Sequence, residues 1–292
     1  MNNDRTPRRP SGPGRGDDRK PSGRPSGGPR GRDESPRRGG PPGRGRPGAS
    51  RRDDDRRPRR DDTERTVDQK IYDGPPIPDD VSAKDLDKYA RQQLQGLPEK
   101  LAERVARHLV MAGLLIESDP ETAHLHALAA RARASRNGLI REASGETAYA
   151  AGKFAEALSE FRAARRMNGQ RLYAPMMADC ERALGRPEKA LAYDTPEIRA
   201  QLDDSGQVEL SIVMAGARRD LGQAEAAAHL LETESLHSKS REPWVARLRY
   251  AYADTLLDLG RTEEAVEWFH RVVAVDGNHL TDAEDRIAAL EG

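Results

Sequence analysis

The chain has 292 residues, with 49 basic and 49 acidic side chains. This neutrality hides two opposed segments: residues 1–66 hold 20 Lys and Arg against 11 Asp and Glu, and the remainder holds 29 against 38. A single cysteine, Cys180, excludes a disulfide framework or a metal site built on the cysteines of one chain. The longest apolar run is far short of the roughly 20 residues of a membrane-spanning helix, and the hydrophilic start lacks a signal-peptide core. We therefore expect a cytoplasmic protein without a membrane partner.

Residues 1–66 contain no Val, Ile, Leu, Phe, Tyr or Trp and are dominated by Arg, Gly, Pro, Ser and Asp. Because such a segment has no apolar surface to bury, we expect a disordered, basic Arg/Gly/Pro-rich tail. Its Arg-Gly pairs, for example Arg15-Gly16 and Arg44-Gly45, resemble segments that bind single-stranded nucleic acid. Acidic blocks interrupt the positive charge, however, and interleaved aromatic residues are missing. A solubilising tail, a weak RNA contact and a specific partner motif remain as interpretations, with the first favoured.

Residues 67–81 form a Pro-rich linker that carries too few apolar residues for a strand of its own. We expect its apolar side chains to lie against the folded part as an ordered arm; they are Ile71, Tyr72, Ile77 and Val81.

Residues 82–292 show helical periodicity throughout, which predicts an all-α fold. Ser82 is a suitable N-cap with Asp85 three residues later, so a first helix is expected to run to about Leu94. Pro98 suits the first turn of the next helix, which is expected to end near residue 117. Ser118-Asp119-Pro120 then turns the chain into a return helix over about 120–135.

A turn signal recurs with periods of 34, 33, 37 and 38 residues, at Ser118, Gly152, Gly185, Gly222 and Gly260. Five residues after each turn lies an alanine: Ala123, Ala157, Ala190, Ala227 and Ala265. Two antiparallel helices approach closely only where side chains are small, and glycine suits a turn whose backbone a Cβ would hinder. The pattern predicts a series of helix–turn–helix repeats at about 98–135, 136–169, 171–200, 206–238 and 243–277.

This pattern resembles the tetratricopeptide repeat, most closely at 136–169 and 243–277, where Gly145, Tyr149 and Phe161 or Tyr250 and Phe269 accompany the turn. The repeat at 171–200 departs, because Thr195-Pro196 stops its second helix and Asp194 replaces the usual aromatic residue. Three segments, Pro75–Val81, Leu101–Leu109 and Phe161–Met167, resemble an actinobacterial family of tetratricopeptide proteins with charged, disordered N-termini. The resemblance implies an α-solenoid, closed by a capping helix at 280–290.

The sequence contains no phosphate-binding glycine loop, nucleophile elbow or His-Glu-x-x-His motif. His124 and His126 are two residues apart on a helix, hence on different faces, which disfavours a shared metal. Cys180 on an Ala-rich helix is interpreted as a buried small residue. We expect neither catalytic residues nor cofactor or metal sites, and we do not expect an enzyme.

In tetratricopeptide arrays the first helix of each repeat lines a groove, and this analogy places nine residues there: Glu142, Glu146, Tyr149, Asp179, Arg182, Arg219, Arg247, Tyr250 and Asp254. Glu142 and Glu146 stand where family members that clamp a peptide carboxylate have Lys and Asn, so that ligand class is disfavoured. The leading hypothesis is a scaffold that binds a protein partner in this groove. The alternative is an RNA- or ribosome-associated factor that contacts phosphates through residues 1–66.

Overall fold

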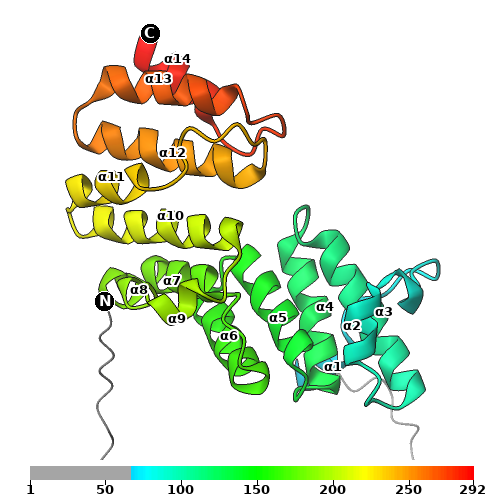
Figure 1. Cartoon of the computed structure of the whole chain (residues 1–292). Coiled ribbons are helices and arrows are strands. Elements are labelled where there is room, and N and C mark those ends of the chain that lie inside the picture. The colour runs from blue at the N-terminus through cyan, green and yellow to red at the C-terminus, as the bar shows by residue number, and fades with distance from the viewer. Residues whose placement is uncertain (1–66) are drawn as a thin grey trace, which may run out of the picture. The chain divides into compact units, whose positions relative to one another are not determined.

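The computed structural model describes residues 67–292, and the predicted tail at 1–66 lies outside them. Every regular element in the described residues is helical, and no strand occurs among them, as the all-α prediction requires (Figure 1). In chain order the α-helices are α1 Val67–Asp73, α2 Lys88–Gln93, α3 Glu99–Leu115, α4 Pro120–Arg133, α5 Gly138–Ala150, α6 Phe154–Asn168, α7 Ala174–Ala183, α8 Pro187–Leu191, α9 Pro196–Arg199, α10 Asp204–Asp220, α11 Ala224–Glu232, α12 Pro243–Asp258, α13 Thr262–Val273 and α14 Ala283–Glu291.

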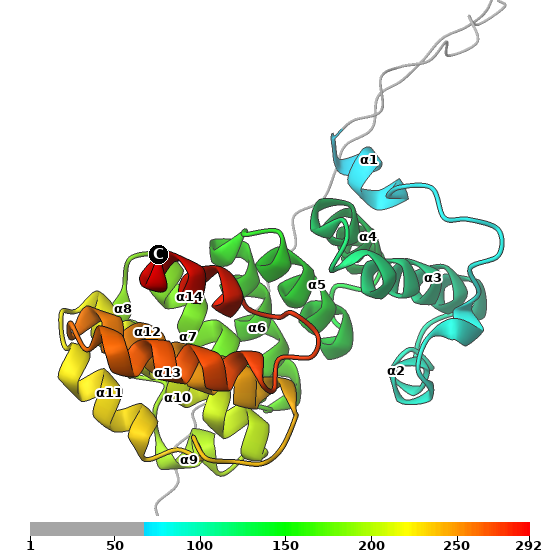
Figure 2. The same cartoon turned by 90° about the horizontal axis from the view of Figure 1, so that it is seen from above.

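The helices pair into successive hairpins, which Figure 2 shows from above: α3 with α4, α5 with α6, α7 with α8, α10 with α11, and α12 with α13. Neighbouring hairpins contact each other through α4–α5, α6–α7, α7–α10 and α10–α12, and α14 packs on α13. The buried apolar side chains accordingly form a chain of clusters between hairpins instead of one central core.

Four of the five predicted turns share one backbone geometry. Gly152, Gly185, Gly222 and Gly260 all have φ near +70°, which only glycine adopts without strain. At each, the glycine N–H donates to the carbonyl three residues back and the next N–H to the carbonyl five residues back, as in Gly152 to Tyr149 and Lys153 to Ala148. This Schellman arrangement satisfies carbonyls that a helix end leaves free. Ser118 lacks it, and the chain turns there at Asp119, whose carboxylate accepts from the Thr122 N–H and caps α4.

Close approach of paired helices depends on small residues, as the periodicity predicts. The five alanines after the turns are all 0% exposed. In the second hairpin, Gly145 of α5 faces the ring of Phe161 on α6, and a Cβ at position 145 would lie only 2.6 Å from Cε1 of that ring. The large apolar residues Phe161 and Phe269 fill the space beside these contacts.

The arm differs from the prediction in its first half, because residues 67–73 form helix α1, which packs on α4. Of the four apolar residues of the arm, Ile71, Ile77 and Val81 are half-buried and Tyr72 is exposed. Arg107 of α3 donates to the carbonyls of Val81 and Pro78 at 2.7 and 2.8 Å. Arg133 of α4 stacks over the Tyr72 ring at 4.2 Å from its centroid.

The prediction of one helix from 82 to 94 was wrong. Ser82 and Asp85 do form the expected capping box, but they cap only a 3₁₀ turn at Ala83–Asp85. Leu86 is extended, and the carboxylate of Asp87 caps a separate helix, α2, by accepting from the N–H groups of Tyr89 and Ala90. Ser82 and Asp87 are both suitable N-caps and lie five residues apart, so two short helical elements begin here instead of one helix.

Candidate functional site

All nine predicted groove residues lie on the first helices of consecutive hairpins, α5, α7, α10 and α12. Each of them has an intrachain polar partner, which sequence reasoning did not anticipate.

At the junction of α5 and α7, two tyrosines donate to carboxylates of the other hairpin. The Tyr149 hydroxyl donates to Oδ2 of Asp179, and the Tyr173 hydroxyl donates to Oε1 of Glu146, both at 2.6 Å. Glu142, one turn before Glu146, accepts from Nδ2 of Asn168 at 2.5 Å. These carboxylates of α5 are therefore held by neutral donors and not by cations.

Arg182 connects α7 to α10. Its Nη1 donates to Asp179 at 2.9 Å, and its Nε donates to Asp220 at 2.8 Å. The guanidinium occupies space above Gly216, where the Cβ of any other residue would lie 2.5 Å from Cζ. Gly216, in the interior of α10, is the sequence feature that permits this approach, and sequence reasoning did not single it out.

Arg219 makes the same kind of connection between α10 and α12, with Nη1 2.7 Å from Asp254 and Nε 2.5 Å from Asp258. Asp254 also accepts from Arg286 of α14 at 2.6 Å. The two remaining predicted residues pair similarly: Arg247 with Glu209 at 2.6 Å and the Tyr250 hydroxyl with Asp282 at 2.5 Å.

These pairs link neighbouring first helices and leave little charge free for a ligand. Partly exposed ion pairs contribute up to about 1 kcal/mol each, so packing of the hairpins contributes more than these pairs to the helix spacing. Burial, followed by the hydrogen bond to Asp282, raises the pKa of Tyr250 to about 12. Burial also raises the pKa of Tyr149, and its bond to Asp179 acts in the same direction. Both phenols are therefore neutral donors at physiological pH.

Between these polar pairs lies an open hollow of about 460 Å³ with a largely apolar floor. Leu172, 53% exposed, precedes α7, and Pro175, Met176 and Val213 continue the apolar surface onto α7 and α10. The Tyr149–Asp179 and Arg247–Glu209 pairs bound it. A second hollow of about 550 Å³ adjoins it at Asp179 and is lined by Arg182, Pro187 and Asp220, among others. Sequence reasoning missed the apolar floor, because Leu172 and Met176 resemble ordinary core positions.

The histidines on α4 contact different neighbours, as their spacing predicted. His124 lies 3.3 Å from Thr147 and 3.2 Å from Glu156, and His126 lies 3.0 Å from His108. No group of three or more His, Cys, Asp or Glu side chains in residues 67–292 is arranged to hold a metal ion. Cys180 is fully buried, as predicted.

Two glutamates on this array are buried with arginines around them. Glu160 lies 2.5 Å from Arg131 and 2.7 Å from Arg141. Glu181 lies 2.6 Å from both Arg162 and Arg186. Burial of a carboxylate is costly unless it is paired, so these ion pairs join α4, α5, α6 and α7 internally; neither glutamate lines the hollow.

Within residues 67–292, none of the helices is both long and apolar enough to cross a membrane. Comparisons with protein-family models, with curated proteins and with solved structures find no match to this chain.

Proposed function

We propose that this chain is a non-enzymatic, cytoplasmic scaffold that binds a segment of a protein partner along its first helices. The observation that carries the proposal is the open hollow of about 460 Å³ between α5, α7, α10 and α12. It combines an apolar floor at Leu172, Met176 and Val213 with polar pairs on its borders. Apolar anchors inside a polar border are typical of protein interfaces.

The proposed architecture is an α-solenoid of tetratricopeptide-like repeats. Its support is the recurrence of one turn geometry at four glycines and of a fully buried alanine five residues after each turn. In such an array each hairpin buries its apolar face on its neighbours, and the first helices share one side. Arg182 and Arg219 link neighbouring first helices on this side through ion pairs with Asp220 and Asp254.

The test uses capture of a partner from cell lysate on the full chain and on two variants. Leu172→Asp places a charge in the floor of the hollow at a half-exposed position. Leu114→Asp, at a position 66% exposed on α3, is the matched control outside it. Losing the burial of one leucine and adding a buried charge reduces affinity at least about tenfold. We expect one protein to be retained by the full chain and by Leu114→Asp but not by Leu172→Asp.

Treatment with nuclease separates this proposal from the second one, in which residues 1–66 contact RNA or the ribosome. That proposal rests on the excess of basic residues in this segment, which lies outside the described residues. Binding of that kind falls steeply with salt through counterion release. Capture that disappears with nuclease and ignores Leu172→Asp would support it and contradict the scaffold.

A further inference from the structure

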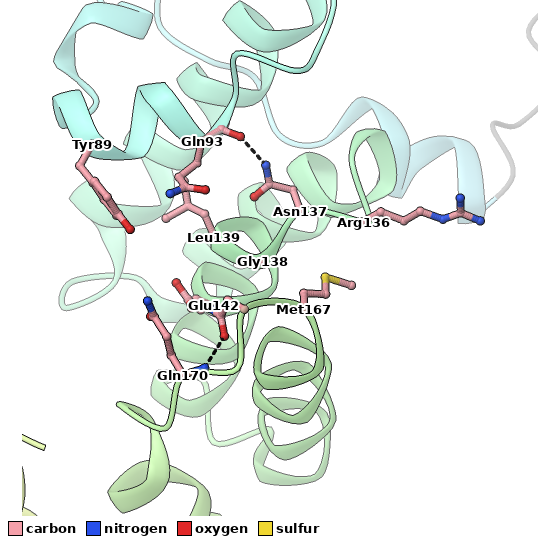
Figure 3. A pocket seen from close by; sticks show the side chains of 10 residues that line it. Tyr89, Gln93, Arg136, Asn137, Gly138, Leu139, Glu142, Met167 and Gln170 are labelled. Carbon is pink, nitrogen blue, oxygen red and sulfur yellow. Dashed lines mark hydrogen bonds between the residues drawn. The ribbon is translucent and has the colours of Figure 1, made fainter. Parts of the chain in front are cut away.

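A separate pocket of about 350 Å³ lies where α2 meets the start of α5 and the end of α6 (Figure 3). Tyr89 and Gln93 come from α2, Leu139 and Glu142 from α5, and Gln170 from the segment after α6. The walls are fixed by side-chain hydrogen bonds. Nδ2 of Asn137 donates to the Gln93 carbonyl at 2.7 Å, which joins the first turn of α5 to α2.

Glu142 is the one acidic residue that lines this pocket, and no cation of residues 67–292 pairs with it. Its Oε1 accepts from Asn168, and its Oε2 has no hydrogen-bond partner among the described residues. Figure 3 shows the only basic side chain of the lining, Arg136, extending away from Glu142. Burial, together with the neighbouring Glu146, raises the pKa of Glu142. This carboxylate is stabilised by any cation that enters.

The other groups around Glu142 select the shape of such a cation. Tyr89 is 62% exposed and presents its ring at the edge of the pocket, above Glu142 in Figure 3. The amide groups of Gln93 and Gln170 supply further acceptors near the same space. A planar guanidinium stacks on an aromatic ring and donates in its plane to a carboxylate and to amide oxygens. An ammonium is a point charge that gains less from such an arrangement.

We infer that this pocket binds a single arginine side chain, presented by a protein segment. Its guanidinium pairs with Oε2 of Glu142 and lies against the Tyr89 ring, and its methylene chain lies along Leu139. The inference deepens the proposed function, because Glu142 stands on the same helix as Tyr149 of the hollow. It names the chemistry of one residue that the bound segment carries.

The test is an NMR titration of the isotope-labelled full chain with the blocked tripeptide acetyl-Gly-Arg-Gly-amide. Matched tripeptides carry citrulline, which keeps the planar shape without charge, or lysine, which keeps the charge without the plane. We expect saturable shifts at the side-chain amides of Gln93 and Gln170 with the arginine peptide. Affinity should fall at least fivefold with the lysine peptide and be lost with the citrulline peptide.

Two variants and a control locate the binding. Glu142→Gln and Tyr89→Ala should each lower the affinity for the arginine peptide at least fivefold. Glu103→Gln, at an exposed position on α3, should leave this affinity unchanged. All proteins are full chains, so the arginines of residues 1–66 compete equally in each. Equal binding of lysine and arginine, binding of citrulline, or shifts unaffected by Glu142→Gln would each overturn the inference. The tripeptide does not reach Leu172, so a failed peptide titration would leave the scaffold proposal intact. Likewise, a failed capture of a partner from lysate would leave the result of the titration intact.

Discussion

The contact between Gly145 and Phe161 supports a quantitative prediction about how closely α5 and α6 pack. An alanine Cβ at position 145 would lie 2.6 Å from Cε1 and 2.7 Å from Cδ1 of Phe161. The ring is 1% exposed and stacks on Tyr173 at a centroid separation of 4.7 Å, so it has no free space to move into. Gly113 on α3 is the control, because it is an exposed helical glycine with no atom within 4 Å of its Cβ position.

Replacing glycine by alanine in a helix stabilises it by about 0.5–1 kcal/mol, which is the full effect expected for Gly113→Ala. Gly145→Ala gains the same amount but overpacks a buried ring, which costs about 1–3 kcal/mol. The two variants should therefore differ by about 2 kcal/mol, or roughly 4–8 °C in melting temperature for a folded region of this size.

Thermal unfolding followed by circular dichroism measures this difference directly. Combining Gly145→Ala with Phe161→Leu should cost less than the two single changes added together, because the smaller side chain makes room for the new methyl group. An equal rise in melting temperature for Gly145→Ala and Gly113→Ala would refute the reasoning that this glycine sets the helix spacing.

Two further predictions concern buried titratable groups. Burial, aided by nearby Arg133, lowers the pKa of His108 to about 3 from its ordinary 6.5. The unfolded chain therefore binds the extra proton below pH 6.5, and stability falls as the pH drops from 6.5 toward 3. Denaturant unfolding measures how much the free energy of unfolding falls between pH 7 and pH 5. This fall should be about 2 kcal/mol smaller in His108→Gln than in the unmodified chain, and equal falls would contradict the linkage. Burial raises the pKa of Cys180 to about 12, so a chromogenic thiol reagent should label it only after denaturant is added, and rapid labelling of the folded chain would disprove the buried state.

Local features of this protein were readable from the sequence because they depend on residues close together in the chain. The turn glycines, the buried alanines after them and the capping box at Ser82 each follow from steric or hydrogen-bonding rules that act within a few residues. The analogy with tetratricopeptide arrays placed all nine predicted groove residues on first helices. The capping rule failed over residues 82–94, because two local caps were both strong enough to start a helix.

The partners of those residues lie on helices that are distant in the sequence. Tyr149 reaches Asp179, Arg182 reaches Asp220 and Arg219 reaches Asp258 across 30, 38 and 39 residues. Such pairs depend on how far each hairpin is rotated and shifted on the next, which no periodicity within one hairpin encodes. Rules that act within a few residues therefore account for most of the helices and for the glycine turns between them. Stacking of the hairpins decided that these residues pair with one another, and it left the apolar hollow and a Glu142 whose partner, Asn168, is neutral.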